Sequence, residues 1–249
     1  MQLFFGGVGA FATFDNMCFQ QQSLRDRLEF CLDYLKETLE EEEKKDWTWI
    51  LKPSVTNKGL DISIVKDFSD IIDATEDCPD IREWVLQRYI SNPLLVNGHK
   101  FHLRVYVLCL GALKVYVYGG SGILMLLAAH KYSSDTEDSF AHLSNTAKGA
   151  ELSDFDEEKY VMLLDDLPQC LWRDYPQKFD SLNSATVQVE KIRSSINSIT
   201  CELFRAYENE YTVFSPLANC FELYGLDFMM DENFNVSLLE VFMMLIRDF

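Results

Sequence analysis

The sequence predicts an α+β protein in which antiparallel strand pairs pack with at least one long helix. Residues 47–65 have the pattern of two strands separated by a polar, glycine-containing loop, and residues 101–118 that of two strands joined tightly at Gly111. Residues 184–207 carry apolar side chains close to helical periodicity. With 249 residues, 48% of them hydrophobic, the chain can bury a sizeable core in one domain or in two adjoining lobes.

The net charge and the distribution of cysteines limit which partners and which cellular environment are expected. The net charge of −18 opposes binding to a nucleic acid or an anionic membrane surface, so neither is expected as a partner. The seven cysteines are dispersed without a C-x-x-C pair, which argues against structural zinc and favours a reducing, cytoplasmic environment. The apolar first fourteen residues lack a basic start and are too short to span a bilayer, so neither a signal peptide nor a membrane helix is expected.

The first 46 residues predict a helix and a linker. Ser23 can cap a helix whose apolar side chains recur on one face as far as Leu39, and the charge run at residues 40–46 then forms a solvated linker. The glycines within residues 6–9 suggest a nucleotide-binding loop, but no strand is predicted before them and this interpretation is rejected. We therefore divide the chain into a helical segment, 1–46, and a main region, 47–249.

The strand pair at residues 47–65 brings two lysines to a loop. Lys52 ends the first strand, and Lys58 lies beside Gly59 in the loop. The backbone N–H groups of such a loop, together with lysines, suit an anion such as a polyphosphate. An ordinary hairpin with solvated lysines fits these residues equally well. The loop is not a Walker A motif, because no GK[ST] sequence opens a helix.

The strand at residues 101–110 separates polar from apolar side chains. Its alternation places His102, Arg104 and Tyr106 on one face, together with Lys100, and the apolar residues between them on the other. An arginine on a half-buried strand needs an anion or a carboxylate partner, because an unpaired buried charge is costly. A ligand contact and a structural salt bridge are equally open at this point.

The remaining segments complete the expected order of elements. Trp84–Ile90 forms a strand that ends at the sequence Ser91-Asn92-Pro93, and residues 123–129 form an apolar run after a glycine-rich loop. The acidic residues Glu151–Asp166 are expected as a surface insert. Residues Ser184–Tyr207 form the long helix.

A hairpin that contains two carboxylates closes the chain. Residues 221–230 and 236–242 flank a polar turn, so they are expected as antiparallel neighbours, apolar almost throughout and buried on both faces. Asp227 and Glu240 come to nearly opposite positions when residues are counted outward from the turn. Two like charges in a dry sheet would raise one pKa strongly unless a cation lies between them, and magnesium bound with nucleotide phosphates is the usual solution. The alternatives are a carboxylate at the sheet edge, or one paired with Lys52 or Arg104.

Five sequence blocks resemble, in order, those of the tubulin–tyrosine ligase family. They cover about Trp47 to Val241, and the ordered set is far more specific than any one block. The blocks are W-I-L-K-P-S, W-V-L-Q-R-Y-I-S-N-P-L-L, K-F-H-L-R, H-L-S-N and F-E-L-Y-G-L-D-F-M-M-D with L-L-E-V.

The resemblance implies an α+β ATP-grasp fold. It has two lobes with antiparallel sheets around a nucleotide cleft, and the N-terminal part of the family fold is missing or altered in this chain. It also implies a reaction in which ATP phosphorylates a carboxylate and the amine of a free amino acid displaces phosphate to form an amide. ATP and Mg²⁺ are then the expected cofactors, and a protein acceptor, with the tubulin C-terminal tail as one candidate, is the expected partner.

The same resemblance assigns roles to individual residues. Lys52 would touch the α- and β-phosphates and Arg104 the γ-phosphate or the acyl phosphate, and these two would be catalytic. Asp227 and Glu240 would hold magnesium. The other expected ATP-binding residues are Lys58 and Gly59 in the phosphate loop, Gln87, Arg88, Tyr89 and Ile90 around the adenine, Lys100, and Asn145 in the substrate-side loop.

Four positions depart from the family pattern. His102 stands in place of an aspartate at the ribose, Asp61 in place of a glycine in the phosphate loop, Met125 in place of an arginine, and Phe242 in place of an asparagine that is a further magnesium ligand. One hypothesis is therefore an active protein–amino acid ligase, and the second is a ligase-like nucleotide-binding scaffold that has lost turnover. A ligase acting on small molecules is a third, less favoured by these blocks. The sequence does not specify the transferred amino acid.

Overall fold

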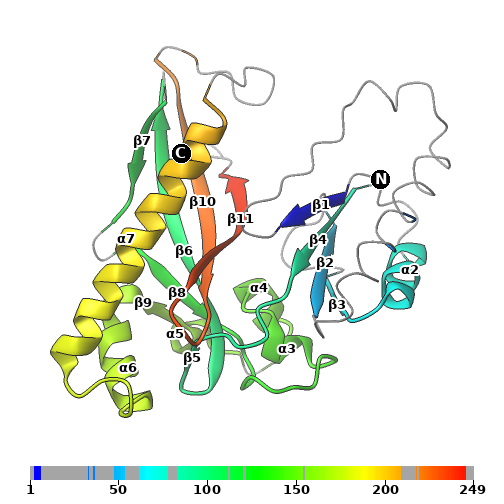
Figure 1. The fold of residues 1–249 in the computed structure, drawn as a ribbon, viewed down its shortest axis with the longest axis horizontal. Coiled ribbons are helices and arrows are strands. Elements are labelled where there is room, and N and C mark those ends of the chain that lie inside the picture. Colours follow the sequence, from blue (N-terminus) through cyan, green and yellow to red (C-terminus); the bar gives the residue numbers. More distant parts are fainter. Residues whose placement is uncertain are drawn as a thin grey trace. The chain divides into compact units, whose positions relative to one another are not determined.

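A computed structural model describes residues 3–6, 33, 36, 48–53, 62–77, 83–111, 113–119, 122–153, 155–208, 217 and 219–244. The chain divides into two compact units, Met1–Ser91 and Asn92–Phe249. Within the described ranges, no helix is long and apolar enough to cross a membrane. Figure 1 shows the elements of both units along the chain.

The described part of the first unit contains a four-stranded sheet and the helix α2. Its elements are β1 (Leu3–Gly6), β2 (Trp49–Pro53), β3 (Ser63–Val65), α2 (Phe68–Glu76) and β4 (Trp84–Arg88), and the strand order is β1-β4-β2-β3. The β2–β3 pair is antiparallel, which confirms the predicted strand pair at residues 47–65. β1 instead runs parallel to β4, so the expectation that no strand precedes the first glycines is wrong. The division of the chain at residue 46 stays a prediction.

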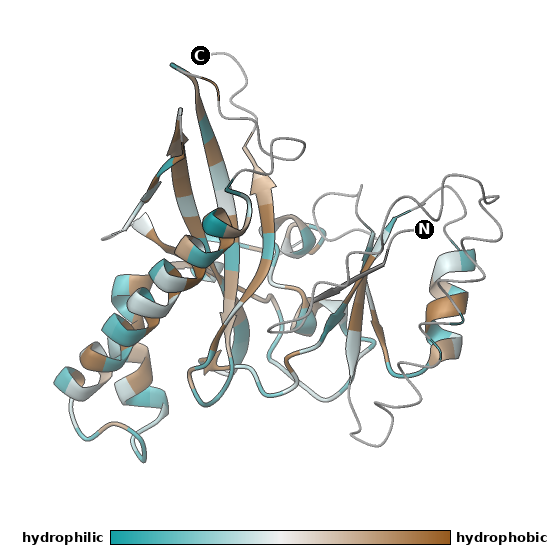
Figure 2. Cartoon of the chain, turned by 45° about the horizontal axis from the view of Figure 1, so that its top comes forward, coloured by the Kyte–Doolittle hydropathy of each residue, from teal (hydrophilic) through white to brown (hydrophobic). Residues whose placement is uncertain are grey.

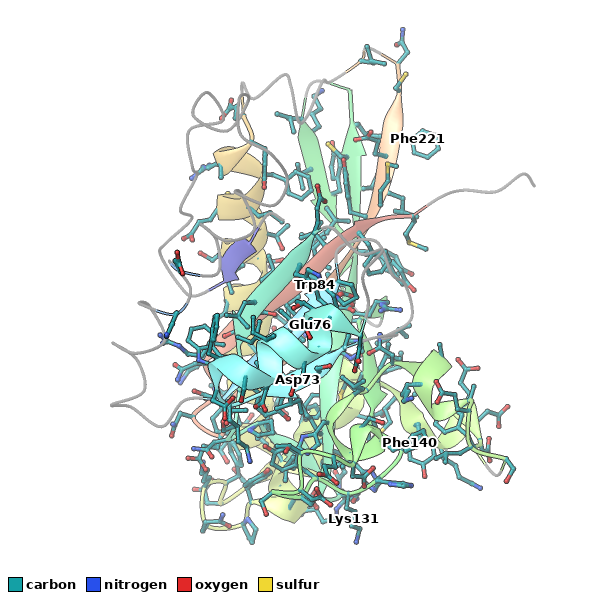
Figure 3. All side chains as sticks on the ribbon, turned by 90° about the vertical axis from the view of Figure 1, so that its right-hand side faces the viewer. Asp73, Glu76, Trp84, Lys131, Phe140 and Phe221 are labelled. Carbon is teal, nitrogen blue, oxygen red and sulfur yellow. The ribbon has the colours of Figure 1, made fainter. Side chains whose placement is uncertain are left out.

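The helix α2 was not predicted, although it begins with a complete capping box. The carboxylate of Asp67 accepts a hydrogen bond from the Asp70 backbone N–H at 3.1 Å, and the carboxylate of Asp70 accepts one from the Asp67 N–H at 3.4 Å. Ile71 is fully buried. On the solvent side, Asp73 and Glu76 project from the helix, as Figure 3 shows.

The second unit is built on a seven-stranded sheet. Five strands follow the order β11-β10-β6-β8-β9, and the other two pair with β6. The strands are β5 (Leu95–Val96), β6 (His99–Leu110), β7 (Lys114–Val117), β8 (Leu124–Leu127), β9 (Val161–Leu163), β10 (Phe221–Met230) and β11 (Val236–Met243). The helices are α3 (Ser139–His142), α4 (Thr146–Gly149), α5 (Glu157–Tyr160), η3 (Leu164–Asp166), α6 (Leu167–Asp174) and α7 (Leu182–Ala206).

Helices α6 and α7 cover the apolar face of this sheet. α7 lies along the sheet in Figure 1, and Figure 2 shows its hydrophobic and hydrophilic residues alternating around the helix. The buried side chains of α7 join a single core with those of β6 and β10. Ser181 caps α7, since its hydroxyl accepts a hydrogen bond from the Ser184 N–H at 3.2 Å. The predicted helix at residues 184–207 is thereby confirmed.

Two other predictions have mixed outcomes. The acidic segment Glu151–Asp166 is not only a surface insert: its second half contains β9, which pairs with β8, and Leu164 is 1% exposed. A short apolar run inside the acidic segment supplies this strand. Of the helix predicted from Ser23, only Asp33 and Lys36 fall within the described residues, and both are helical and exposed.

Candidate functional site

The candidate site lies where β6, β10 and β11 run side by side in the second unit. Arg104 on β6 is the register partner of Asp227 on β10, and Asp227 is the register partner of Glu240 on β11. Register partners on neighbouring strands share a face of the sheet. The predicted juxtaposition of the two carboxylates is therefore confirmed, and Arg104 joins them.

A β-bulge produces this juxtaposition. Phe228 pairs with Leu238 while Asp227 pairs with Glu240, so Leu239 is an extra residue on β11. Without the bulge, a regular ladder would place Leu239 opposite Asp227 and Glu240 opposite Leu226, whose side chain faces the apolar core. The extra residue brings Glu240 to the polar face. Bulges often re-aim a side chain next to a functional site.

Arg104 and Asp227 form a two-pronged ion pair. The Arg104 Nε donates to Asp227 Oδ1 at 3.0 Å and the Nη2 donates to Oδ2 at 2.8 Å. Asp227 is 3% exposed, so its charge depends on this pair. Burial by itself lowers the pKa of the Arg104 guanidinium, but the hydrogen bonds and charge of Asp227, with a contribution from Glu240, outweigh burial and raise that pKa. The alternative that Arg104 neutralises Asp227 is confirmed.

His102 and Ser144 extend this polar row. His102 Nδ1 lies 2.6 Å from Ser144 Oγ in a hydrogen bond, and His102 Nε2 lies 3.4 Å from Asp227 Oδ2. All three side chains are buried. Ser144 was not predicted as a site residue, although it belongs to the H-L-S-N block and directly precedes Asn145.

The edge strand β11 departs from the prediction. The two strands of the hairpin were expected to be buried on both faces, but β11 is the last strand of the sheet and Glu240 is exposed. An exposed carboxylate costs little to keep ionised, so the two acids do not need a cation merely to coexist. Glu240 is exposed, and Asp227 is bound by Arg104.

In the first unit, the structure brings Lys52 and Gln87 together. The Lys52 Nζ donates to Gln87 Oε1 at 2.8 Å. Tyr89 is buried and its N–H donates to the Thr48 carbonyl at 2.9 Å, while Ile90 is half-buried. Arg88 is exposed, with its guanidinium carbon 5.7 Å from the centre of the Trp49 ring. Lys52, Gln87 and Arg88 belong to neighbouring strands of one sheet, and Tyr89 and Ile90 follow directly after β4.

The remaining predicted site residues differ in their burial and in their location in the fold. Lys100 is 3% exposed. Burial of the nearby His142 is the main cause that lowers the pKa of its imidazole, and the charge of Lys100 lowers that pKa further. Asn145 is half-buried at the N-cap of α4. Met125 is fully buried in the core of the second unit, opposite Leu103. Lys58, Gly59 and Asp61 lie outside the described residues.

The donor set on this face fits magnesium delivered with a nucleotide. Mg²⁺ is usually held by one or two protein carboxylates, with phosphates and waters completing an octahedron. Asp227 and Glu240 supply two such carboxylates. In the part of the chain that the structure describes, no group of three or more His, Cys, Asp or Glu side chains could hold a metal ion. The two carboxylates therefore fit a metal whose other ligands are phosphates and waters.

Comparison with known proteins identifies the family. The family model described as "Tubulin-tyrosine ligase family" matches residues 14–244. The chain belongs to the tubulin-tyrosine ligase family. A crystal structure of the C-terminal domain of K. lactis Pby1, "an ATP-grasp enzyme interacting with the mRNA decapping enzyme Dcp2", shares 32% sequence identity at a TM-score of 0.53 and covers 87% of this chain and 54% of that one. The fold is the ATP-grasp fold, of the α+β class.

Curated relatives agree with this family. A probable tubulin–tyrosine ligase of Saccharomyces cerevisiae is 31% identical, and the match covers 83% of this chain and 31% of the relative. A probable tubulin–tyrosine ligase of Schizosaccharomyces pombe is 32% identical, covering 80% and 51%. A probable tubulin polyglutamylase of Homo sapiens is 32% identical, covering 78% and 30%. The chain thus spans about half or less of the length of these relatives, and it is a ligase-like member of its family.

Proposed function

We propose that this tubulin-tyrosine ligase family member is an ATP-dependent ligase that joins an amino acid to a protein through an amide bond. The observation that carries the proposal is the register of Arg104, Asp227 and Glu240 on one sheet face. This arrangement offers two oxygen donors for a divalent cation and one guanidinium for a phosphoryl group. The sequence similarity to ATP-grasp proteins supports the same conclusion.

The proposed reaction has two steps. A carboxylate oxygen of the acceptor attacks the γ-phosphorus of ATP, the bond to the bridging oxygen breaks, and ADP leaves. The amine nitrogen of the amino acid then attacks the carbonyl carbon of the acyl phosphate. Phosphate departs with the electron pair of the broken C–O bond, and the nitrogen loses a proton to solvent. No side chain needs to act as a nucleophile, so catalysis rests on positioning and charge stabilisation.

The roles of the chain's own residues follow from their chemistry. Asp227 uses two of the five N–H donors of Arg104, and no further hydrogen bond of Arg104 is recorded among the described residues. The other donors can bind the equatorial oxygens of a transferring phosphoryl group. Lys52 would bind the α- and β-phosphates and is oriented by Gln87. Bound Mg²⁺, held by Asp227 and Glu240, would neutralise phosphate charge.

Calorimetry and an incorporation assay test the proposal together. Mg-ATP binding is measured on the unmodified chain and on Lys52→Ala and Asp227→Ala variants, with Arg173→Ala as an exposed-charge control. ATP-dependent incorporation of labelled tyrosine, glutamate or glycine into tubulin is then assayed. We expect binding in the unmodified chain, weakened binding in both site variants and incorporation of one amino acid. No Mg-ATP binding by the folded chain would overturn the proposal.

The second candidate is a nucleotide-binding scaffold without turnover. Phe242 favours it, because this side chain supplies no oxygen ligand on the face that contains Glu240. Losing one transition-state donor typically lowers a rate by ~10²–10³. Mg-ATP binding without incorporation of any amino acid would select this candidate.

The partners and the compartment are also proposals. A protein acceptor and a free amino acid are the proposed substrates, and the relatives named as tubulin ligases and polyglutamylases support a tubulin tail as one acceptor. The interaction of K. lactis Pby1 with Dcp2 supports testing other proteins as well. A cytoplasmic location is proposed from the dispersed cysteines, of which Cys109, Cys170, Cys201 and Cys220 are free thiols.

A further inference from the structure

We propose that Phe242 is a positioning residue that holds the guanidinium of Arg104 in place for binding a phosphoryl group. This inference rests on the proposed function, because it concerns the phosphate-binding role given there to Arg104. From the sequence, Phe242 counted only as the loss of a magnesium ligand. Its contacts in the structure give it a role of its own.

The first observation is a contact that spans three strands. The guanidinium carbon of Arg104 lies 4.9 Å from the centre of the Phe242 ring. Arg104 is on β6 and Phe242 is on β11, and β10 lies between them. Strands in a sheet are about 4.8 Å apart, so the two backbones are separated by about 10 Å. The two side chains must therefore meet above β10.

The second observation is that Gly225 on β10 makes this meeting possible. Gly225 is the register partner of Phe242, and a Cβ at this position would lie 2.1 Å from the ring Cζ. A side chain on residue 225 would displace the ring. The absence of a Cβ lets the ring lie across β10 and reach Arg104, as in other pairs where an aromatic side chain covers a glycine on a neighbouring strand.

The two contacts together restrain the guanidinium in different directions. Asp227 holds the guanidinium through two hydrogen bonds, and the guanidinium carbon lies over the Phe242 ring in a cation–π contact. The Arg104 side chain is 24% exposed, so one part of it stays accessible to a ligand. A guanidinium held by two hydrogen bonds and by an aromatic ring has less freedom to turn, so its remaining N–H donors keep one orientation. Such pre-organisation is what stabilisation of a developing charge requires.

The test compares ATP with ADP, because a residue that acts on the γ-phosphate changes only the ATP affinity. Calorimetry with Mg-ATP and Mg-ADP is done on the 249-residue chain and on Phe242→Leu, Phe242→Tyr, Gly225→Ala and Arg104→Met. Met243→Leu is the matched control, since Met243 is an exposed apolar residue on the same strand. Thermal unfolding of each variant shows whether the fold is retained.

We expect Phe242→Leu to weaken ATP binding about three- to tenfold, the size of effect that a partly exposed cation–π contact supports, without changing the ADP affinity. Phe242→Tyr keeps an aromatic ring at this position and should therefore retain the ATP preference of the unmodified chain. Gly225→Ala leaves Phe242 in the sequence but displaces its ring, so it should reproduce the loss and gives an independent test. Met243→Leu should have no effect.

Two results would overturn the inference, and they are distinguishable. If Arg104→Met loses the ATP preference while Phe242→Leu and Gly225→Ala keep it, Arg104 binds the γ-phosphate without help from Phe242. If the unmodified chain binds neither nucleotide, the proposed function itself fails and this inference fails with it.

Discussion

Asp227 lies in a buried position, where a carboxylate without a partner would lower the free energy of unfolding. The residue is 3% exposed, and its two oxygens accept hydrogen bonds from Arg104. Removing one member of such a pair leaves the other buried and unpaired, which lowers the free energy of unfolding. Replacing both members by apolar groups can leave that free energy nearly unchanged. The pair is therefore a local structural requirement as well as the centre of the candidate site.

A double-mutant cycle should reveal this coupling. Arg104→Met is expected to lower the free energy of unfolding by about 2 kcal/mol, because it leaves the buried carboxylate without its charged donor. Combining Arg104→Met with Asp227→Leu should recover part of that loss. Urea denaturation gives the four free energies, with Lys159→Met at the exposed Lys159–Asp156 pair as a control that should change stability by less than about 0.5 kcal/mol. Additive effects of the two site substitutions would contradict the expected coupling.

His102 offers a second test at this scale, because restoring the usual family aspartate should harm this chain. A carboxylate at residue 102 would lie beside Asp227 in a buried site and the shared pKa would rise above its unfolded value. The folded state would then bind more protons than the unfolded state, so the destabilisation should grow as pH rises. We expect His102→Asp to be less stable than His102→Asn by about 2 kcal/mol near pH 8 and by less near pH 5, a comparison in which both variants lack the titrating imidazole. Unfolding measured across this pH range decides, and a penalty independent of pH would exclude the carboxylate repulsion.

At the scale of single elements, the alternation of polar and apolar residues along a strand determines whether its two faces can be predicted from the sequence. The strand β6 alternates polar and apolar residues, so its two faces were predicted correctly. The hairpin β10–β11 is apolar on both sides, so periodicity could not reveal the bulge at Leu239 that brings Glu240 to face Asp227. β9 was missed because its short apolar run lies within acidic residues.

The turn between β5 and β6 was predictable but was not among the predicted elements. Asn97 and Gly98 have φ of 53° and 83°, the left-handed values that a two-residue type I′ hairpin requires. The end of α6 secures this turn, since Asp174 Oδ2 accepts a hydrogen bond from the Asn97 N–H at 2.8 Å. Burial alone would raise the pKa of Asp174, but the bonds from Arg173 and the Asn97 N–H outweigh it and lower that pKa.

This lowered pKa predicts how the turn depends on pH. A carboxyl group whose folded pKa is below its unfolded value contributes stability above the unfolded pKa and loses it as pH falls through the folded pKa. We expect Asp174→Asn to lower the free energy of unfolding by about 1 kcal/mol near pH 7, and the difference from the unmodified chain to shrink progressively as pH falls below about 4. Asp165→Asn, at an exposed carboxylate that pairs with Arg193, is the control. A difference that persists at acid pH would show that the charge of Asp174 is not what stabilises the turn.

At the scale of the whole molecule, the residues proposed to bind the nucleotide belong to two different units. Lys52 and Gln87 belong to the first, and Arg104, Asp227 and Glu240 belong to the second. Composition and periodicity predicted the strands that contain these residues, but only the ordered family blocks linked the two sets to one reaction. The contacts of His102 with Ser144 and of Arg104 with Phe242 depend on tertiary packing, and no local sequence signal reveals them.

The net charge of −18 leads to a prediction about the acceptor. If the acceptor is an acidic polypeptide such as a tubulin tail, chain and acceptor repel each other at long range. Salt shortens the Debye length from about 30 Å at 0.01 M to about 10 Å at 0.1 M, so screening should raise kcat/KM for the acidic acceptor. With saturating Mg-ATP, the assay compares a glutamate-rich peptide with the same peptide in which non-acceptor glutamates are replaced by glutamine. We expect kcat/KM to rise with potassium chloride for the glutamate-rich peptide and to stay nearly constant for the glutamine-substituted peptide. A fall in kcat/KM with salt would mean that a local basic surface guides the acidic acceptor despite the net charge.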